Sequence, residues 1–475
     1  MEDPVVVPVI LAGGKGVRLW PISREAMPKP YVRTAEFEDT LLQATLRRVT
    51  DIGEQSKTLV VCNKDHDFLV SGQAQASARN GVRLLLEPEG RNTAPAICAA
   101  ALVLAAGGSD EPMLVLPADH VIKNQDAFTQ AVTSGVDLAR KGHLVTFAIK
   151  PAFPATGYGY LKIGEPIDVA ARQFKIEAFV EKPDAEVAMQ FLASGGYAWN
   201  SGMFVFRPSV MLAAFERYQP GILEACREAV GTFAADADVK IERAAFARAP
   251  SISIDYAIME KASNVATVVA EFDWSDVGDW QAVWSIAAQD SSGNAVYGNA
   301  EAIASSGSLV HSDGPLLVGV GLVDMIAVAT KDAIIVAPRD KAQDVKLAVE
   351  KLRTSNRPEA SSSKKVHRPW GSFEQLHIGP GFQVKELTVL PGAKLSLQRH
   401  KFRGEHWVCI AGEGFATRDK DRIHLSVGTG VFIPQGSVHR LENPGPDVLR
   451  VVETQIGNYT GEDDIERIED IYGRA

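Results

Sequence analysis

The stretch VVVPVILAGGKGVRLWPISREAMPKP, residues 5–30, decides the fold. Its apolar run, residues 5–11, leads directly into a loop that contains Gly13, Gly14 and Gly16. A continuous apolar run that stops at a glycine loop is typical of a strand buried on both faces of a parallel sheet. We therefore expect an α/β fold whose ligand binds at the carboxyl ends of the strands.

Alternation of strands and helices continues along the first 290 residues. Short apolar runs recur at 58–62, 113–117, 144–149 and 203–206, and helical patterns lie between them, for example at 40–50 and 127–140. This alternation supports an α/β sheet and predicts a domain over residues 1–290.

The glycine loop has the composition of a phosphate-binding loop. Gly13, Gly14 and Gly16 allow the backbone to approach a phosphate chain and to point its N–H groups at the anion. Arg18 and Lys29 add cations that can neutralise charge during phosphate chemistry. The spacing matches neither the P-loop motif nor the dinucleotide-binding motif, and a plain glycine turn with two solvated cations is the alternative.

Composition excludes several classes of protein. The 475 residues predict two or three domains, and the net charge of −10 argues against binding to nucleic acid. The four cysteines are scattered through apolar stretches and indicate buried thiols of a reducing compartment. No signal peptide or membrane span is expected, so we predict a cytoplasmic protein that binds no membrane.

The remainder of the chain divides into three segments of different composition. Residues 291–353 combine short β-like segments with a final helix and suggest a β-helix-like coil, whose exposed strand edges would favour a homo-oligomer. Residues 354–365 have the composition of a linker. Residues 366–475 suggest a small antiparallel barrel, and the tail from Thr460 is expected to form a helix with Ile465, Ile468 and Tyr472 on one face.

The predicted barrel carries a metal-binding pattern. Gln398 and His400 alternate along one strand and therefore point to the same side. Glu405 and His439 would complete a site of nitrogen and oxygen ligands. A single histidine in a β-rich domain is more often structural, but two histidines with a carboxylate and an amide favour a metal.

Eight ordered motifs across residues 5–350 resemble those of the sugar-1-phosphate nucleotidyltransferases, in the mannose-1-phosphate guanylyltransferase branch. They are the glycine loop followed by PK, LEPEGRNTAPAI (86–97), LPADH (116–120), TGYGYL (156–161), FVEKP (179–183), WNSGMFVF (199–206), SIDYAIMEK (253–261) and WSDVGDW (274–280). The resemblance implies a Rossmann-like nucleotidyltransferase domain that transfers GMP from GTP to mannose 1-phosphate, giving GDP-mannose and pyrophosphate.

The same resemblance assigns roles to individual residues. It implies that Asp119 and Asp276 hold Mg²⁺, for which an oxygen-only site is suited. Lys182 would contact the phosphate of the sugar phosphate, and the sugar hydroxyls would contact Gly159, Glu181 and Asn200. The nucleotide would bind Arg91 and Asn92 together with Gly13, Gly14 and Gly16. Guanine as the base rests on the resemblance alone.

Residues 366–475 resemble a cupin, similar to the mannose-6-phosphate isomerase domain fused to such guanylyltransferases. The resemblance rests on the spacings G-x5-Q-x-H-x4-E-x6-G and G-x5-P-x-G-x2-H-x3-N and on the surrounding segments RPWG and EHWVCIAGEG. The resemblance implies interconversion of mannose 6-phosphate and fructose 6-phosphate with a divalent transition metal such as Zn²⁺, Co²⁺ or Mn²⁺. Arg467 or Arg474 would bind the phosphate or lie over the site, and the sequence does not fix the general base.

Two departures from the family pattern leave alternatives open. Pro30 and Tyr31 stand where relatives usually have Gln and Phe, and Lys401 and Phe402 stand where relatives often continue a run of histidines. The alternatives are a guanylyltransferase with a structural cupin, a transferase for another hexose or base, and a non-catalytic sensor of sugar nucleotides.

Overall fold

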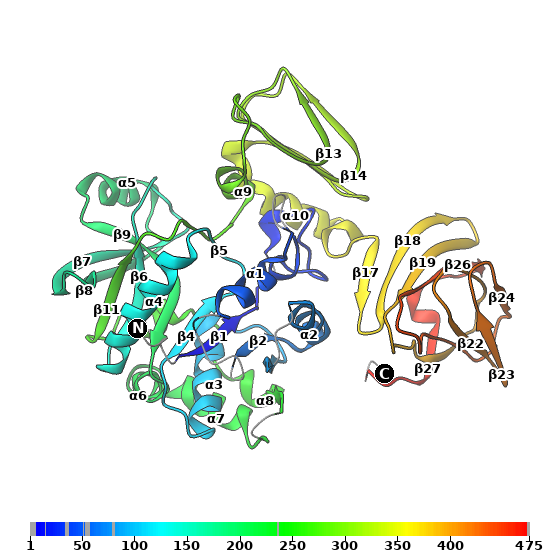
Figure 1. Ribbon diagram of the computed structural model, residues 1–475, viewed down its shortest axis with the longest axis horizontal. Helices are drawn as coiled ribbons and strands as arrows, with labels where there is room; N and C mark the ends of the chain where they lie inside the picture. The colour runs from blue at the N-terminus through cyan, green and yellow to red at the C-terminus, as the bar shows by residue number, and fades with distance from the viewer. Residues whose placement is uncertain are drawn as a thin grey trace. The chain divides into compact units, whose positions relative to one another are not determined.

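The computed structural model describes residues 6–14, 16–33, 38–50, 52, 58–77, 81–234 and 237–472. The chain forms two compact units (Figure 1). The first comprises Met1–Ser23, Pro28–Thr330 and Ile334–Val349, and the second comprises Arg24–Met27, Lys331–Ala333 and Glu350–Ala475. The domain limits suggested by the sequence, at residues 290, 353 and 365, stay predictions.

A ten-stranded sheet runs through the first unit and confirms the α/β fold. Each of the five apolar runs forms one of its strands. In order across the sheet, the strands are β10 (Val239–Lys240), β3 (Arg83–Glu87), β2 (Leu59–Asn63), β1 (Val7–Leu11), β4 (Met113–Pro117), β9 (Tyr197–Phe206), β6 (Leu144–Ile149), β11 (Val265–Ala270), β8 (Gln173–Glu181) and β7 (Gly159–Asp168).

The sheet is mixed rather than wholly parallel. Strand β1 is parallel to β2 and β4, but β9 runs antiparallel to both β4 and β6. The chain reaches β9 through the antiparallel pair β7 and β8 and then α5 (Ala185–Ser194). An apolar run shows that a strand is buried, but it does not specify the direction of that strand.

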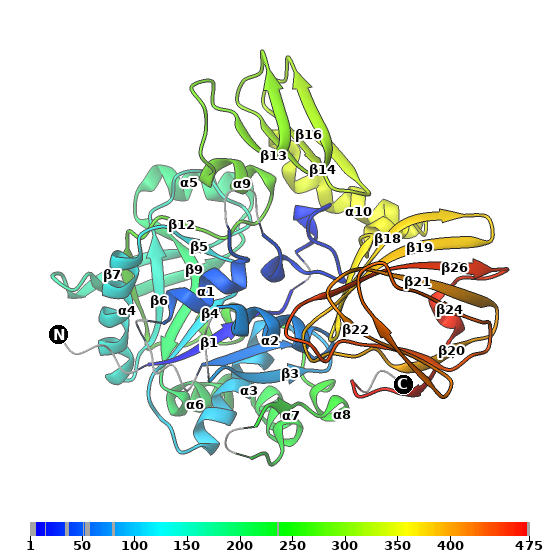
Figure 2. The ribbon, with the colours of Figure 1, turned by 45° about the vertical axis from the view of Figure 1, so that its right-hand side comes forward.

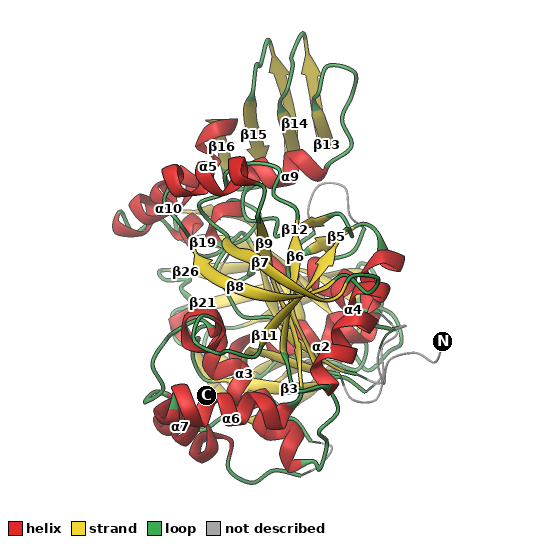
Figure 3. Ribbon diagram, turned by 90° about the vertical axis from the view of Figure 1, so that its left-hand side faces the viewer, coloured by secondary structure: helices red, strands yellow, loops and turns green. Residues whose placement is uncertain are grey.

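Helices cover both faces of this sheet (Figure 3). Val205 of β9 lies under Gly135 of α4, whereas its neighbours Phe204 and Phe206 belong to the core shared with α3, α6 and α7. Successive side chains of a strand point to opposite faces, so two sets of helices are needed. The helices are α1 (Leu41–Arg48), α2 (Asp67–Ala76), α3 (Thr93–Ala106), α4 (Gln125–Arg140), α6 (Pro208–Tyr218), α7 (Pro220–Val230), α8 (Arg243–Phe246) and α9 (Trp280–Ile286).

Several short elements connect these layers and carry site residues. They are the two-residue strands β5 (Val121–Ile122) and β12 (Trp274–Ser275), the 3-10 helices η1 (Val17–Leu19), η2 (Lys29–Tyr31) and η4 (Lys64–His66), and the π-helix η5 (Asp255–Met259).

A small parallel coil follows, as expected. Strands β13 (Ala295–Ile303), β14 (Leu309–Val320) and β15 (Met325–Ala329) pair in parallel, and β16 (Ile334–Pro338) closes the sheet antiparallel to β15. Ala295, Leu309 and Ile326 occupy matching positions on successive strands and are fully buried. Stacking of this kind is the β-helix-like packing predicted from the sequence. The 3-10 helix η6 (Arg339–Asp344) and helix α10 (Val345–Thr354) end the segment.

Two antiparallel sheets enclose the core of the second unit, which is the all-β barrel expected (Figure 2). Trp370, Trp407 and Val451 are among the side chains buried between them. One sheet contains β17 (Lys365–Arg368), β18 (Gly371–Gly379), β19 (Phe382–Val389), β26 (Leu449–Gly457), β21 (Arg403–Ala411) and β24 (Gly430–Ile433). The other contains β23 (Asp421–Leu425), β22 (Gly414–Arg418), β25 (His439–Glu442), β20 (Leu397–His400) and β27 (Ile465–Glu469).

The tail does not form the predicted helix. Glu462–Asp464 make one 3-10 turn, η8, and Ile465–Glu469 form β27, which pairs antiparallel with β20. The isoleucine spacing and acidic first turn favour a helix locally, but pairing with β20 satisfies the same backbone groups within the sheet.

The predicted linker, residues 354–365, is also more ordered than its composition suggests. It contains the 3-10 helix η7 (Pro358–Ala360), and Ala360 is buried. The Ser361 carbonyl accepts a hydrogen bond from the Ala26 amide at 3.1 Å, and the Ser362 carbonyl accepts one from Arg24. Long-range backbone contacts of this kind cannot be read from composition.

Two global expectations can be compared with the structure. The four cysteines are buried and unpaired, as predicted. Among the residues described, no helix has the length and apolar character needed to span a membrane.

Replacing Asp464 tests how the tail is anchored. Its carboxylate accepts hydrogen bonds from the Lys401 and Phe402 amides at 2.9 and 3.2 Å and lies 3.6 Å from Arg403. Asp464→Ala leaves the two part-buried amides without this acceptor and removes a carboxylate from beside the buried Arg403, which keeps Glu405 and the Gly461 carbonyl as partners. We expect a loss of about 2–4 kcal/mol in the free energy of unfolding. Hydrogen exchange should show faster exchange of both amides.

The control is Asp463→Ala, which removes an exposed carboxylate bonded only to the exposed Tyr459 hydroxyl among the described residues. Its effect should stay below about 1 kcal/mol. Equal losses in the two variants would contradict the anchoring role of Asp464.

Candidate functional site

Two strand ends meet at Lys29 in the first unit. Asp119 follows β4, Asp276 follows β12, and the antiparallel pairing of β5 with β12 brings the two segments together. The Lys29 ammonium lies 2.9 Å from the Asp119 carboxylate and donates to the Asp276 carbonyl. Segments far apart in the sequence thus converge on one buried cation.

Glycine is required where the loop passes Lys29. Gly16 has a φ of 54°, and a Cβ on it would lie 2.3 Å from the Lys29 Cβ. Any other residue would combine a strained backbone with a steric clash. Gly14, with a φ of 105°, has no atom of the described part of the chain within 4 Å of an added Cβ.

Charge fixes the protonation of this cluster. Burial by itself would raise the pKa of Asp119, but the neighbouring Lys29 outweighs that effect and holds the pKa below its usual value. Burial lowers the pKa of His120 to about 4. His120 is therefore neutral at pH 7, and its Nδ1 accepts a hydrogen bond from the Trp274 indole at 3.1 Å.

The Asp276 carboxylate is held by its own loop and by an aromatic side chain. One oxygen accepts hydrogen bonds from the Tyr158 hydroxyl at 2.8 Å and from the Gly278 amide at 3.0 Å. A Cβ on Gly278 would lie 2.7 Å from the other oxygen, so this loop also depends on glycine. Tyr158 belongs to the TGYGYL motif but was not expected to have this role.

Arg18 is positioned by a residue that the sequence did not indicate. Gln343 of η6 accepts a hydrogen bond from the Arg18 guanidinium at 3.0 Å, and its amide donates to Asp279. Nothing in the local sequence around Gln343 distinguishes it from a surface glutamine at the end of the β-coil.

The four residues expected on the sugar side lie together. Gly159 and Glu181 are paired across β7 and β8, and a Cβ on Gly159 would meet the Glu181 carboxylate at 2.5 Å. Lys182 has a φ of 49°, and its ammonium lies 2.6 Å from that carboxylate. A Cβ on Gly159 would also lie 3.4 Å from the Asn200 Cβ, which places Asn200 at the same spot.

Asp255 is a further member of this group. The Asn200 amide donates to its carboxylate at 2.9 Å, while the Asn200 oxygen accepts from the Thr146 hydroxyl at 2.6 Å. Burial, followed by the charge of Glu181, raises the pKa of Asp255 to about 7. Asp255 begins η5, a π-helix, and such turns frequently occur at functional sites. Its presence in SIDYAIMEK was the only sequence signal.

The structure does not join Arg91 and Asn92 to the glycine loop through any contact of the described residues. Arg91 donates to Glu89 and to the Ala249 carbonyl. Asn92 accepts from the Thr93 amide at 2.9 Å and so caps α3. Both lie in the loop after β3, whose end faces the same edge of the sheet.

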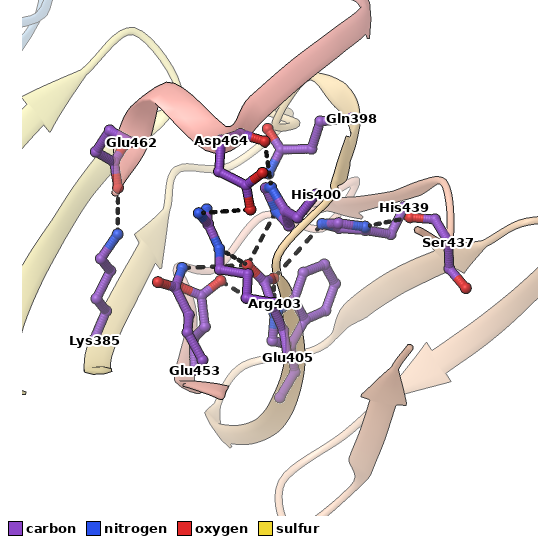
Figure 4. Close-up of polar contacts among 12 residues, drawn as sticks. Lys385, Gln398, His400, Arg403, Glu405, Ser437, His439, Glu453, Glu462 and Asp464 are labelled. Carbon is purple, nitrogen blue, oxygen red and sulfur yellow. Dashed lines mark hydrogen bonds and ion pairs between the residues drawn. The ribbon is translucent and has the colours of Figure 1, made fainter. Parts of the chain in front are cut away.

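A second cluster lies inside the barrel of the second unit (Figure 4). His400, Glu405 and His439 come from β20, β21 and β25, and their ligand atoms lie within 4.8 Å of one another. The Nε2 atoms of His400 and His439 lie 3.0 and 3.5 Å from the two Glu405 oxygens. All three side chains are buried.

The donor set fits a divalent metal. Nδ1 of His439 lies 3.0 Å from the Ser437 carbonyl, and Nδ1 of His400 lies 3.4 Å from the Asp464 carbonyl. These contacts favour a proton on Nδ1 and leave each Nε2 lone pair facing Glu405. Both Nε2 atoms are buried without a hydrogen-bond partner.

A cavity inside the second unit reaches Glu405, and Gln398 and Arg467 lie in its wall. Gln398 is directly opposite His439 in the sheet, and its side-chain oxygen accepts from Ser396 at 2.8 Å. Nε of Arg467 is buried and has no hydrogen-bond partner. The other arginine expected here, Arg474, lies outside the described residues.

The cavity also contains charged residues that sequence reasoning missed. Arg368, Lys385 and Arg403 contribute positive charge, and Glu453 contributes a second buried carboxyl group. Burial, with the nearby charge of Glu405, raises the pKa of Glu453 well above its usual value. The sequence signal that could have found Glu453 is the alternation along β26, because inward positions of a barrel strand recur every second residue.

Comparison with known protein families identifies both units. Residues 7–293 match the nucleotidyl transferase family, 298–352 the mannose-phosphate isomerase/GMP-like β-helix domain, and 355–470 the mannose-6-phosphate isomerase C-terminal family. The chain belongs to the nucleotidyl transferase family. Within it, this nucleotidyl transferase belongs to the bifunctional branch with a β-helix segment and a cupin, as the resemblance implied.

Relatives of this nucleotidyl transferase match it over almost its full length. The alginate biosynthesis protein AlgA of Pseudomonas aeruginosa is 44% identical over 99% of this chain and 98% of its own. Mannose-1-phosphate guanylyltransferase of Escherichia coli is 44% identical over 99% and 100%. The crystal structure of mannose-1-phosphate geranyltransferase from Thermus thermophilus superposes with a TM-score of 0.65 at 34% identity, covering 73% of this chain and 99% of that one.

The raised pKa of Asp255 predicts a pH-dependent cost in stability. Because the folded-state value of about 7 exceeds the ordinary 3.8, the folded nucleotidyl transferase binds this proton more tightly than the unfolded chain. The contribution of protonated Asp255 to the free energy of unfolding is therefore fully present below about pH 4 and is lost as the pH rises through about 7. In Asp255→Asn this loss should disappear.

Urea unfolding at about pH 5 and about pH 8 measures the effect. Between about pH 5 and about pH 8, the free energy of unfolding of the unsubstituted protein should fall by on the order of 1 kcal/mol or more relative to that of Asp255→Asn. Asp273→Asn, which removes an exposed carboxylate, serves as the control. Identical pH dependence in all three proteins would show that Asp255 ionises freely.

Proposed function

We propose that the first unit transfers GMP from GTP to mannose 1-phosphate, releasing pyrophosphate and forming GDP-mannose, and that the cupin interconverts mannose 6-phosphate and fructose 6-phosphate. The observation that carries the proposal is the convergence of Asp119, Asp276 and Lys29 beside the glycine loop. Full-length similarity to a guanylyltransferase and to proteins of alginate and xanthan biosynthesis supports it.

In the transferase, Asp119 and Asp276 would hold Mg²⁺, which supplies positive charge to the reacting phosphates. Arg18 and Lys29 add fixed cations where negative charge develops as pyrophosphate leaves. The backbone N–H groups of Gly13, Gly14 and Gly16 are suited to the phosphate chain. Arg91 and Asn92 are proposed as nucleotide contacts on the opposite side of that loop.

The sugar phosphate is proposed to bind beside Lys182 and Glu181. The Lys182 ammonium would contact the attacking phosphate, and Glu181 and Asn200 would orient the sugar through its hydroxyl groups. Gly159 is proposed to contact the sugar through its backbone, and its lack of a Cβ lets the Glu181 carboxylate lie close to it. Fixing both reactants in this way supplies much of the rate of a phosphoryl-type transfer.

In the cupin, Gln398, His400, Glu405 and His439 would hold a divalent transition metal such as Zn²⁺, Co²⁺ or Mn²⁺. Such an ion polarises a carbonyl and its neighbouring hydroxyl, as exchange between an aldose and a ketose requires. Arg467, and Arg474 beyond the described residues, are proposed to hold the sugar phosphate. Arg368 and Lys385 also line the cavity, where Lys385 is paired with Glu462.

Replacing Asp276 tests the transferase site. In Asp276→Asn, pyrophosphate release from GTP, mannose 1-phosphate and Mg²⁺ should fall by at least about 100-fold, because a carboxylate that would hold the metal loses its charge. Asp273→Asn removes a nearby charge at an exposed position and should retain activity. Comparable activity in the two variants would contradict the assignment of Asp276.

Replacing His439 tests the cupin site. His439→Gln should lose bound transition metal, measured by elemental analysis, and should lose the exchange of mannose 6-phosphate with fructose 6-phosphate. Pyrophosphate release by the first unit should be unchanged. His406→Gln is the matched control, because His406 lies on β21 beside Glu405 but is exposed and stacks on Phe432. Isomerisation that survives in metal-free His439→Gln would overturn the proposal.

A further inference from the structure

Arg48 is a buried cation without an anionic partner in the transferase unit. It is the last residue of α1, and only 6% of its surface is exposed. Its guanidinium donates to the Thr45 hydroxyl at 3.2 Å and to the His120 carbonyl at 3.0 Å. Both acceptors are neutral, as is the Phe128 ring 6.0 Å away. Across the described part of the chain no carboxylate forms an ion pair with Arg48, and a buried charge without a counter-ion is costly.

Arg48 lines a cavity of about 360 Å³ beside α1. This volume is within the range of small-molecule sites, which are mostly apolar and contain few polar groups. Part of the wall is aliphatic and consists of Leu41, Ala44, Val121 and Ile122. The second cation of the wall, Arg47, is mostly exposed and lies 2.8 Å from the Asp39 carboxylate. The charge of Arg48 is therefore the one that the wall leaves uncompensated.

The chemistry of the cavity restricts the ligand. A guanidinium can only donate hydrogen bonds, and its planar fork matches the oxygens of a phosphate or a carboxylate. Burial lowers the pKa of Arg48 to about 10, so the group is still charged at pH 7. The aliphatic wall favours an apolar body attached to that anionic group. A metal cation is disfavoured, because the wall holds two arginines and one aspartate.

We propose that this cavity is an additional binding site for a small organic oxyanion, whose phosphate or carboxylate group lies on Arg48 and whose apolar part lies against α1 and β5. Neither the proposed guanylyl transfer nor the proposed isomerisation assigns a role to the cavity. Binding there does not depend on either activity, whereas the regulatory effect of the ligand rests on the proposed transferase.

The cavity adjoins the segment that carries Asp119. Helix α1 holds the backbone just before that residue, because Thr45 donates to the Ala118 carbonyl at 3.3 Å. It also holds the backbone just after it, through the hydrogen bond from Arg48 to the His120 carbonyl. Strand β5 follows, forms part of the wall, and pairs with β12, which leads to the second proposed metal ligand. A ligand on Arg48 would therefore act on the elements that position Asp119 and regulate the affinity of the transferase for Mg²⁺.

Three probes that share a benzene ring test the site: phenyl phosphate, benzoate and benzyl alcohol. Isothermal titration calorimetry on the full chain measures their dissociation constants. At least one of the two anions should bind, and benzyl alcohol should bind at least about tenfold more weakly, the value of one hydrogen bond to a charged group. Tighter binding of phenyl phosphate would identify the ligand as a phosphate ester, and tighter binding of benzoate would identify it as a carboxylate.

Substitutions in the wall assign the binding to this cavity. Ala44→Phe would fill the cavity with a ring and leave Arg48 in place, so the binding of the anion there should be lost. Arg48→Met removes the charge and should weaken anion binding at least about tenfold without affecting benzyl alcohol. Arg47→Met is the matched control, because Arg47 lies in the same wall but is paired with Asp39. It should change the dissociation constant by less than about threefold.

The regulatory effect is measured by pyrophosphate release at increasing Mg²⁺ concentrations, with and without the bound anion. The Mg²⁺ concentration that gives the half-maximal rate should change by about fivefold or more in the unsubstituted protein and stay constant in Ala44→Phe. Competition of the probe at the sugar-phosphate site would instead raise the KM of mannose 1-phosphate equally in both proteins.

Equal anion binding by the unsubstituted protein and Ala44→Phe would place the probes elsewhere and overturn the inference. Benzyl alcohol that binds as tightly as both anions, or no binding of either anion, would also overturn it, even if neither variant folds. An unchanged Mg²⁺ requirement in the presence of the bound anion would reject the regulatory role. Failure to release pyrophosphate from any nucleotide would reject the proposed transferase and leave the binding result intact.

Discussion

The contact on which the transferase site depends is the buried ammonium of Lys29 between two segments distant in sequence. Its charge keeps Asp119 ionised despite burial, and its hydrogen bond to the Asp276 carbonyl joins the end of β12 to that of β4. The surrounding backbone accommodates that one side chain. Gly16 must lack a Cβ because Lys29 lies against it. The conformation of the glycine loop and the positions of Lys29, Asp119 and Asp276 are therefore not independent features.

In the cupin the central buried charge is a carboxylate rather than an ammonium. There a single carboxylate, Glu405, lies between two imidazoles and beside Arg403, and its charge is stabilised although it is fully enclosed. The adjacent Glu453 is correspondingly pushed toward its protonated form. Two neighbouring carboxyl groups with opposite tendencies are a common arrangement for proton transfer, and both line the same cavity here.

Local patterns predicted the elements well, and long-range pairing accounts for the failures. Apolar runs located the central strands, because a strand depends on residues close in sequence. His400, Glu405 and His439 lie on three different strands, and their spacing predicted the cluster because it resembles that of a known family. The antiparallel direction of β9 and the strand at Ile465–Glu469 depend on partners far away. The roles of Asp255 and Gln343 were invisible for the same reason, since each acts through a contact made only in the folded chain.

Gln343 changes how the β-helix-like segment is understood. A coil that only spaced two domains would have no reason to reach the phosphate loop, yet η6 at its end holds Arg18 and contacts Asp279, the N-cap of α9. In the proposed site, an unrestrained Arg18 guanidinium would lose side-chain entropy on meeting a phosphate. By holding it beforehand, the segment lowers that cost. The end of the coil thus positions Arg18 in the proposed transferase site.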